Sequence, residues 1–99
     1  MNDITLHRRA EKGLRGLSKT EKRKAISAIT RIGEAEWQDI LRDRNLHKLT
    51  GSLGGEKLYS YKSSPRIRLI IRHLGENKIL IEDIASHDTL RRYFNWRDE

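Results

Sequence analysis

The spacing of the apolar residues changes along this 99-residue chain, from a helical period in the first half to a strand period in the second. Four apolar residues of the first half recur at steps of three or four, the repeat of an α-helix: Leu6, Ala10, Leu14 and Leu17. After Gly55, apolar and polar residues alternate, as they do in a half-buried strand. A chain of this length supports one core, so helices and strands must pack together in a single α+β domain, residues 1–99.

The first half predicts a short strand followed by a helical hairpin. Ile4 and Leu6 alternate with polar neighbours, which indicates a brief opening strand. The first helix of the hairpin should be short, because Gly13 and Gly16 have low helix propensity.

The second helix should begin at a capping box, because Ser18 stands three residues before Glu21. Its buried stripe is expected at four apolar positions, Ala25, Ile26, Ile29 and Ile32. Gly33 is expected to end this helix, and the apolar residues between Trp37 and Leu41 indicate a further helical turn.

The second half predicts three strands and a closing helix. Alternation marks strands at 57–62, 66–74 and 79–85, with turns at Ser63-Ser64-Pro65 and Gly75-Glu76-Asn77-Lys78 between them. Residues 87–94 are typical of a short closing helix. The helical hairpin should cover one face of the sheet and leave the other face open.

The open face is expected to be basic. Arg66, Arg68 and Arg72 fall on one face of the strand at 66–74. Because three like charges repel one another, this spacing favours an anionic ligand over a merely solvated outer surface. Lys57 and Lys62 in the neighbouring strand strengthen that interpretation.

Charge and composition exclude several classes of protein. The formal charge of +7 is concentrated in residues 1–33 and 46–78, which indicates a polyanionic partner. The absence of cysteine excludes disulfides, a thiolate nucleophile and cysteine-ligated zinc. No histidine spacing suits a metal, no glycine-rich phosphate loop occurs, and no apolar run is long enough to span a bilayer or form a secretory signal. We therefore expect a cytoplasmic protein without metal or cofactor.

His87 is a candidate for proton transfer. It falls at the end of the last predicted strand, beside Asp88, and an imidazole can exchange a proton near neutral pH. A structural or simply exposed histidine is the more common alternative. Tyr59 and Tyr61 share a strand face and could stack on bases, although such tyrosines more often belong to the core.

Several segments in order resemble the RelE/ParE superfamily of bacterial type II toxins over nearly the full length of the chain. The matching segments are 46–51, 58–70 and 79–88, followed by Tyr93. The resemblance implies the family fold, a small twisted antiparallel sheet with an N-terminal helical hairpin packed on one face and a short C-terminal helix.

RelE-like members cleave mRNA in the ribosomal A site, so the resemblance implies a metal-independent endoribonuclease that works by attack of a ribose 2′-OH. Arg68 would hold the scissile phosphate, and His87 would be the general acid or base. Tyr93 would orient the 2′-OH or stack on a base, and Lys57 would be a substitute base or phosphate ligand. Further RNA contacts are implied for Arg66, Arg72, Lys62, Lys48, Lys22 and Lys24.

The family also leaves alternatives open. Its ParE-like members inhibit DNA gyrase without nuclease residues, and a third possibility is an inactive module that retains only a partner-binding surface. Some RelE members carry two lysines near positions 58 and 60, whereas Lys57 and Lys62 lie beside those positions, so the general base is not assigned. The implied partners are a cognate antitoxin, in a higher-order complex, and the ribosome with its mRNA, but no membrane.

Overall fold

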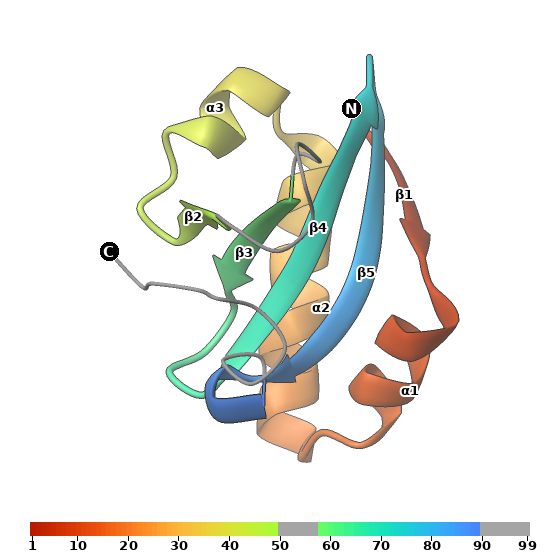
Figure 1. Ribbon diagram of the computed structural model, residues 1–99, viewed down its shortest axis with the longest axis vertical. Coiled ribbons are helices and arrows are strands. Elements are labelled where there is room, and N and C mark those ends of the chain that lie inside the picture. Colours follow the sequence, from red (N-terminus) through yellow and green to blue (C-terminus); the bar gives the residue numbers. More distant parts are fainter. Residues whose placement is uncertain (50–57, 90–99) are drawn as a thin grey trace.

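The computed structural model describes residues 1–49 and 58–89, which form an α+β fold with one five-stranded sheet. The elements in chain order are β1 (Asp3–Leu6), α1 (Arg8–Arg15), α2 (Lys19–Glu34), α3 (Trp37–Leu41), β2 (Leu46–Lys48), β3 (Leu58–Lys62), β4 (Ile67–Gly75) and β5 (Lys78–Ser86). The strands lie in the order β1-β5-β4-β3-β2. Figure 1 shows α2 behind the strands, α1 beside β1 and β5, and α3 near β2 at the other edge. The predicted α+β class is confirmed.

The sheet is mixed, so the prediction of a wholly antiparallel sheet is wrong. β1 runs parallel to β5, with Asp3 opposite Lys78 and Leu6 opposite Ile81, and the other three pairs are antiparallel. Parallel neighbours require a long crossover, which the intervening helices and strands provide. β2 was not predicted, because a strand of three residues is too short to display a period.

Helix α1 approaches β5 so closely that only glycine fits at one position. His7 caps the start of α1 by accepting a hydrogen bond from the backbone N of Arg9 (3.0 Å), and Gly16 caps its end. A Cβ atom on Gly13 would overlap the carbonyl oxygen of Ile84 and would lie 3.0 Å from its carbonyl carbon. Gly13, which the sequence marks only as a weak helix former, is therefore required for packing.

Helix α2 begins as predicted, and its buried stripe keeps Ala25, Ile29 and Ile32 but includes Ala28 in place of Ile26. Ser18 Oγ accepts a hydrogen bond from the backbone N of Glu21 (3.2 Å), which confirms the capping box. The buried residues are Ala25, Ala28 and Ile32. Ile26 was wrongly predicted to be buried, since it is 49% exposed, and the helix continues past Gly33 to Glu34. Among the described helices, none is long and apolar enough to cross a membrane.

The core lies between the helices and one face of the sheet. The central strands contribute the buried residues Ile67, Leu69, Ile71, Ile79, Ile81 and Ile84. The register shifts between Ile70 and Ile71, and the extra residue on β5 lets both Ile81 and Ile84 face the core. The opposite face, which we call the open face, carries a smaller apolar cluster of Leu49, Leu58 and Ile70.

The two strand tyrosines belong to the core side, so the alternative of a base-stacking platform is wrong. Tyr61 is 2% exposed, and its hydroxyl donates a hydrogen bond to Asp43 Oδ2 (2.6 Å). Tyr59 packs edge-on against Trp37, with ring centroids 5.2 Å apart. Both aromatic rings are therefore used in packing rather than presented to a ligand.

The Asp43–Tyr61 contact predicts a pH-dependent contribution to stability. Burial alone would raise the pKa of Asp43, but the hydrogen bonds from Tyr61 and Asn45, with Arg31 nearby, lower it overall. A carboxyl with a lowered pKa stabilises the fold above the pKa of the unfolded chain, and this contribution is lost as the pH falls through the folded value. We expect D43N to lower the free energy of unfolding by about 1.5 kcal/mol at pH 7.

Urea denaturation of the wild type and D43N from pH 7 to pH 3 measures this effect. The difference between the two proteins should shrink as the pH falls below about 4, the pKa of an unfolded aspartate, toward the lowered pKa of the folded carboxyl. A difference that stays constant across this range would show that the charge of Asp43 contributes nothing.

Candidate functional site

Three basic or imidazole residues lie at one end of the sheet. Lys62 on β3 and Arg68 on β4 are directly opposite in the sheet register, and Ala85 on β5 is opposite Arg68. His87 follows two residues after Ala85, at the same end of the sheet. We call Lys62, Arg68 and His87 the basic end.

The pairing of Lys62 with Arg68 points to an anionic ligand. Like charges directly opposite in a sheet are destabilising unless something neutralises them. Lys62 is exposed, and within residues 1–49 and 58–89 it forms no ion pair. Lys62 therefore offers a positive charge at the basic end to which an anion could bind.

The turn before β4 orients Arg68. The residue is only 4% exposed, and its Nη1 donates to the carbonyl oxygens of Ser64 (3.0 Å), Pro65 (3.2 Å) and Ile67 (3.4 Å). Ser64 in turn accepts from the backbone N of Ile67 (3.2 Å). Carbonyl oxygens hold the guanidinium in place without removing its charge, because arginine stays protonated in proteins.

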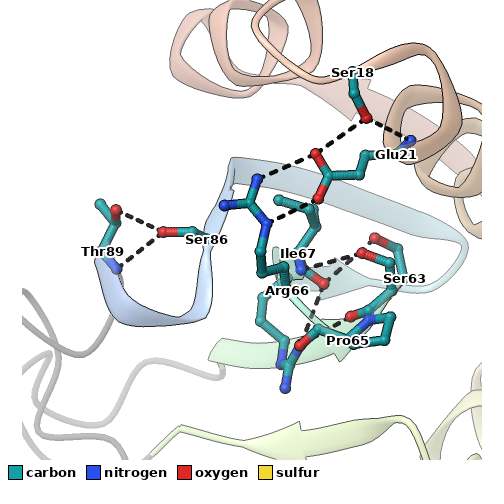
Figure 2. A network of polar contacts seen from close by, with 10 residues as sticks. Ser18, Glu21, Ser63, Pro65, Arg66, Ile67, Ser86 and Thr89 are labelled. Atoms are coloured by element: carbon teal, nitrogen blue, oxygen red, sulfur yellow. Dashed lines mark hydrogen bonds and ion pairs between the residues drawn. The ribbon is translucent and has the colours of Figure 1, made fainter.

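His87 begins a helical turn directly after β5. Its backbone N donates to the carbonyl oxygen of Arg66 (2.8 Å), and its Nδ1 lies 3.8 Å from Asp88 Oδ1. Ser86 caps the turn, since its Oγ accepts from the backbone N of Thr89 (3.1 Å) and donates to Thr89 Oγ1 (2.7 Å), as Figure 2 shows. The imidazole is three-quarters buried, which suits a defined orientation.

Arg66 does not share the open face with Arg68, so that prediction is wrong. Arg66 precedes β4, and its guanidinium forms a two-pronged ion pair with Glu21 of α2 (Nε–Oε2 3.1 Å, Nη2–Oε1 3.2 Å; Figure 2). These hydrogen bonds raise the pKa of Arg66 and lower that of Glu21. The turn releases Arg66 from the strand alternation, which lets it reach the helix layer.

Arg72 lies within β4 as predicted, but it has a carboxylate partner. Its Nε donates to Glu82 Oε1 (3.0 Å), and Arg9 of α1 lies 3.9 Å from the same carboxylate. The inference that all three strand arginines need an external anion is therefore wrong for Arg66 and Arg72, because Glu21 and Glu82 provide internal ones.

The other predicted residues are dispersed or lie outside the described residues. Lys48 is exposed on β2, opposite Tyr59, and thus on the side of the sheet that carries the helices. Lys22 and Lys24 lie on α2. The structure does not bring these three lysines to the basic end. Lys57 and Tyr93 lie outside the described residues.

Two residues of the open face, His47 and Ser60, are not among the site residues predicted from the sequence. His47 on β2 is directly opposite Ser60 on β3, which is fully buried, and Ser60 Oγ has no hydrogen-bond partner among the described residues. The sequence does not predict β2, and without that strand the side of the sheet on which His47 lies could not be predicted. His73, in contrast, stacks flat on Trp37, with ring centroids 4.2 Å apart. In the part of the chain that the structure describes, no group of three histidine or acidic side chains could hold a metal ion.

The fold is similar to that of several solved structures. The sequence matches no protein-family model and no curated protein. YafQ from E. coli strain BL21(DE3) superposes with a TM-score of 0.68 at 19% identity, over 91% of this chain and 98% of that chain. RelE in the archaeal RelE–RelB complex from Pyrococcus horikoshii OT3 gives 0.64 at 21% identity, over 86% and 93%. The YoeB–YefM complex from Staphylococcus aureus gives 0.64 at 21% identity, over 88% and 98%. This chain therefore has the RelE-like fold.

Proposed function

We propose that this chain is the toxin of a type II toxin–antitoxin pair and that it cleaves mRNA on the ribosome. The observation that carries the proposal is the basic end, where Lys62 and Arg68 are directly opposite in the sheet register and His87 follows β5 at the same end of the sheet. The fold supports it, because RelE and YoeB were both solved in complexes with a second protein, RelB and YefM. A related S. aureus structure is described as a toxin–antitoxin complex.

Cleavage would proceed by internal transfer within the RNA. The ribose 2′-oxygen forms a bond to the adjacent phosphorus, the bond from phosphorus to the 5′-oxygen breaks, and a 2′,3′-cyclic phosphate and a 5′-hydroxyl result. A base takes the proton of the 2′-OH, an acid gives a proton to the leaving 5′-oxygen, and cations stabilise the charge that develops on the phosphoryl oxygens.

The proposal assigns these roles to side chains. Arg68 holds the scissile phosphate, Lys62 adds a second positive charge opposite it, and His87 transfers a proton. Lys57 and Tyr93 keep the roles that the family resemblance implies, as alternative base and as orienting group. No metal ion or cofactor takes part in this scheme.

Contacts to the ribosome would come from the wider basic surface. Lys22, Lys24 and Lys48 would bind RNA phosphates, and Arg66 and Arg72 would share their charge between RNA and the carboxylates beside them. The antitoxin partner would form a higher-order complex with the chain in the cytoplasm and suppress its activity.

Expression of the chain in bacteria tests the proposal. In one culture, mRNA 5′ ends and plasmid supercoiling are measured after induction. New 5′ ends within translated codons, with supercoiling unchanged, support the ribosome-dependent nuclease. Loss of supercoiling with intact mRNA would instead support the ParE-like gyrase inhibitor, and normal growth without either change would support a binding module.

Removal of Lys62 should weaken cleavage without loss of stability. K62A deletes one of the two opposed charges, so phosphate binding falls while repulsion with Arg68 is relieved. We expect about tenfold slower cleavage and an unchanged or slightly higher melting temperature. Lys78, exposed at the far end of β5, provides the matched control, and K78A should cleave like the wild type. Equal losses in both variants would contradict a local role for Lys62.

A further inference from the structure

A polar network crosses from the helix layer to the backbone of His87. Ser18 Oγ accepts from the backbone N of Glu21 and donates to its Oε1 (3.3 Å), which fixes the carboxylate at the start of α2. That carboxylate holds the Arg66 guanidinium at 3.1 and 3.2 Å. The carbonyl oxygen of Arg66 then accepts the backbone N–H of His87 at 2.8 Å. Figure 2 shows Arg66 reaching toward Glu21, while the capped turn at Ser86 and Thr89 lies to the other side.

This network reaches the chain at the end of β5. Ser86 is the last residue of β5, and the hydrogen bond from His87 to Arg66 lies one step beyond the Ile67–Ser86 pair. The first residue of the helical turn is therefore held by the backbone of Arg66. Movement of the Arg66 backbone would therefore displace the start of the turn that carries His87.

We infer that Glu21 and Arg66 are positioning residues for His87, a role that rests on the proposed function. The ion pair fixes Arg66, and the Arg66 carbonyl fixes the start of the turn that carries the imidazole. Arg66 would then serve catalysis through its own backbone, in addition to the RNA contact proposed for its side chain. Because the Arg66 side chain is 72% exposed, the pair is screened by solvent and its effect should be moderate.

Steady-state cleavage on programmed ribosomes distinguishes a positioning role, which affects kcat, from an RNA-binding role, which affects KM. E21Q removes the charge of the positioning carboxylate but touches no residue of the basic end. We expect kcat to fall about three- to fivefold with KM unchanged, the size of effect that an exposed ion pair supports. E11Q on α1 makes the same change of charge at an exposed position and should match the wild type. A rise in KM with unchanged kcat in E21Q would overturn the inference, as would an equal loss in E11Q.

A cycle of variants tests whether Glu21 acts through Arg66. R66A should lower kcat by a similar factor, and the double variant E21Q/R66A should be no slower than R66A alone, because both changes break one contact. The exchanged pair E21R/R66E should recover part of the lost kcat. Additive losses without recovery would show that the two residues act independently and would overturn the inference.

Hydrogen exchange of the His87 amide in the isolated protein gives a readout that does not depend on cleavage. Its N–H is bonded to the Arg66 carbonyl, so E21Q should speed its exchange severalfold, while amides in the centre of β4 should be unaffected. Unchanged exchange would overturn the inference. If the wild type cleaves no mRNA but His87 exchange responds to E21Q, the structural coupling stands and the proposed function fails.

Discussion

Replacement of His87 by alanine is expected to slow mRNA cleavage by about 10²- to 10³-fold, the usual contribution of general acid–base catalysis. The imidazole is the one side chain of the basic end that can exchange a proton near neutral pH, whereas Lys62 and Arg68 supply positive charge. Cleavage of a defined mRNA on purified ribosomes, followed under single-turnover conditions, measures the chemical step directly.

His73 supplies a matched control on the same sheet. It lies near the other end of β4, stacked on Trp37, and H73A removes an imidazole without touching the basic end. We expect H73A to lose some stability but to cleave within about threefold of the wild type at a temperature where both proteins are folded. Cleavage by H87A at the wild-type rate would assign proton transfer to another group, such as Lys57 or His47.

Gly13 is the position where a single added methyl group should cost most stability. In G13A the new Cβ would overlap the backbone carbonyl of Ile84, and neither α1 nor β5 can move without opening the core between them. Although alanine is the better helix former by about 1 kcal/mol, we expect a net loss of about 3 kcal/mol in the free energy of unfolding. For a domain of this size, the melting temperature should fall by about 15 °C.

Gly16 provides the comparison within the same helix. It ends α1 at a φ of −82°, which any residue can adopt, and an added Cβ would meet nothing closer than 3.7 Å. G16A should therefore be neutral or more stable by up to about 1 kcal/mol, because alanine has less freedom in the unfolded chain. Similar melting temperatures for G13A and G16A would contradict the close approach of α1 to β5.

Local patterns explain which parts of the fold were predictable. The capping box at Ser18 and the alternation in β4 and β5 are recorded in residues next to one another, and both predictions are confirmed. The edge of the α2 stripe depends on which side of the helix meets the sheet, and this side buries Ala28 while Ile26 stays exposed. The parallel pairing of β1 joins residues that lie 75 positions apart in the sequence, such as Asp3 and Lys78, and no local period reports it.

The sequence predicted which residues belong to the site better than it predicted how they are arranged. Lys62, Arg68 and His87 were all identified from the sequence, and the sheet register brings them to one end. Their chemical roles stay predictions. The arrangement of Arg66 and Arg72 was not predictable, because their carboxylate partners lie 45 and 10 residues away in the chain. Strand alternation predicts on which face of the sheet a side chain lies, but it does not predict which carboxylates from other helices or strands will pair with it.

The parallel pair of β1 and β5 also sets the order in which the chain can fold while it is being made. β1 is synthesised before its partner β5, which begins only at Lys78, so β1 cannot pair until synthesis has passed that residue. Contacts of such long sequence separation form slowly, since loop closure must come before they stabilise anything. The sheet on a translating ribosome therefore stays incomplete until β5 has been made, and a chain interrupted before β5 has no completed basic end.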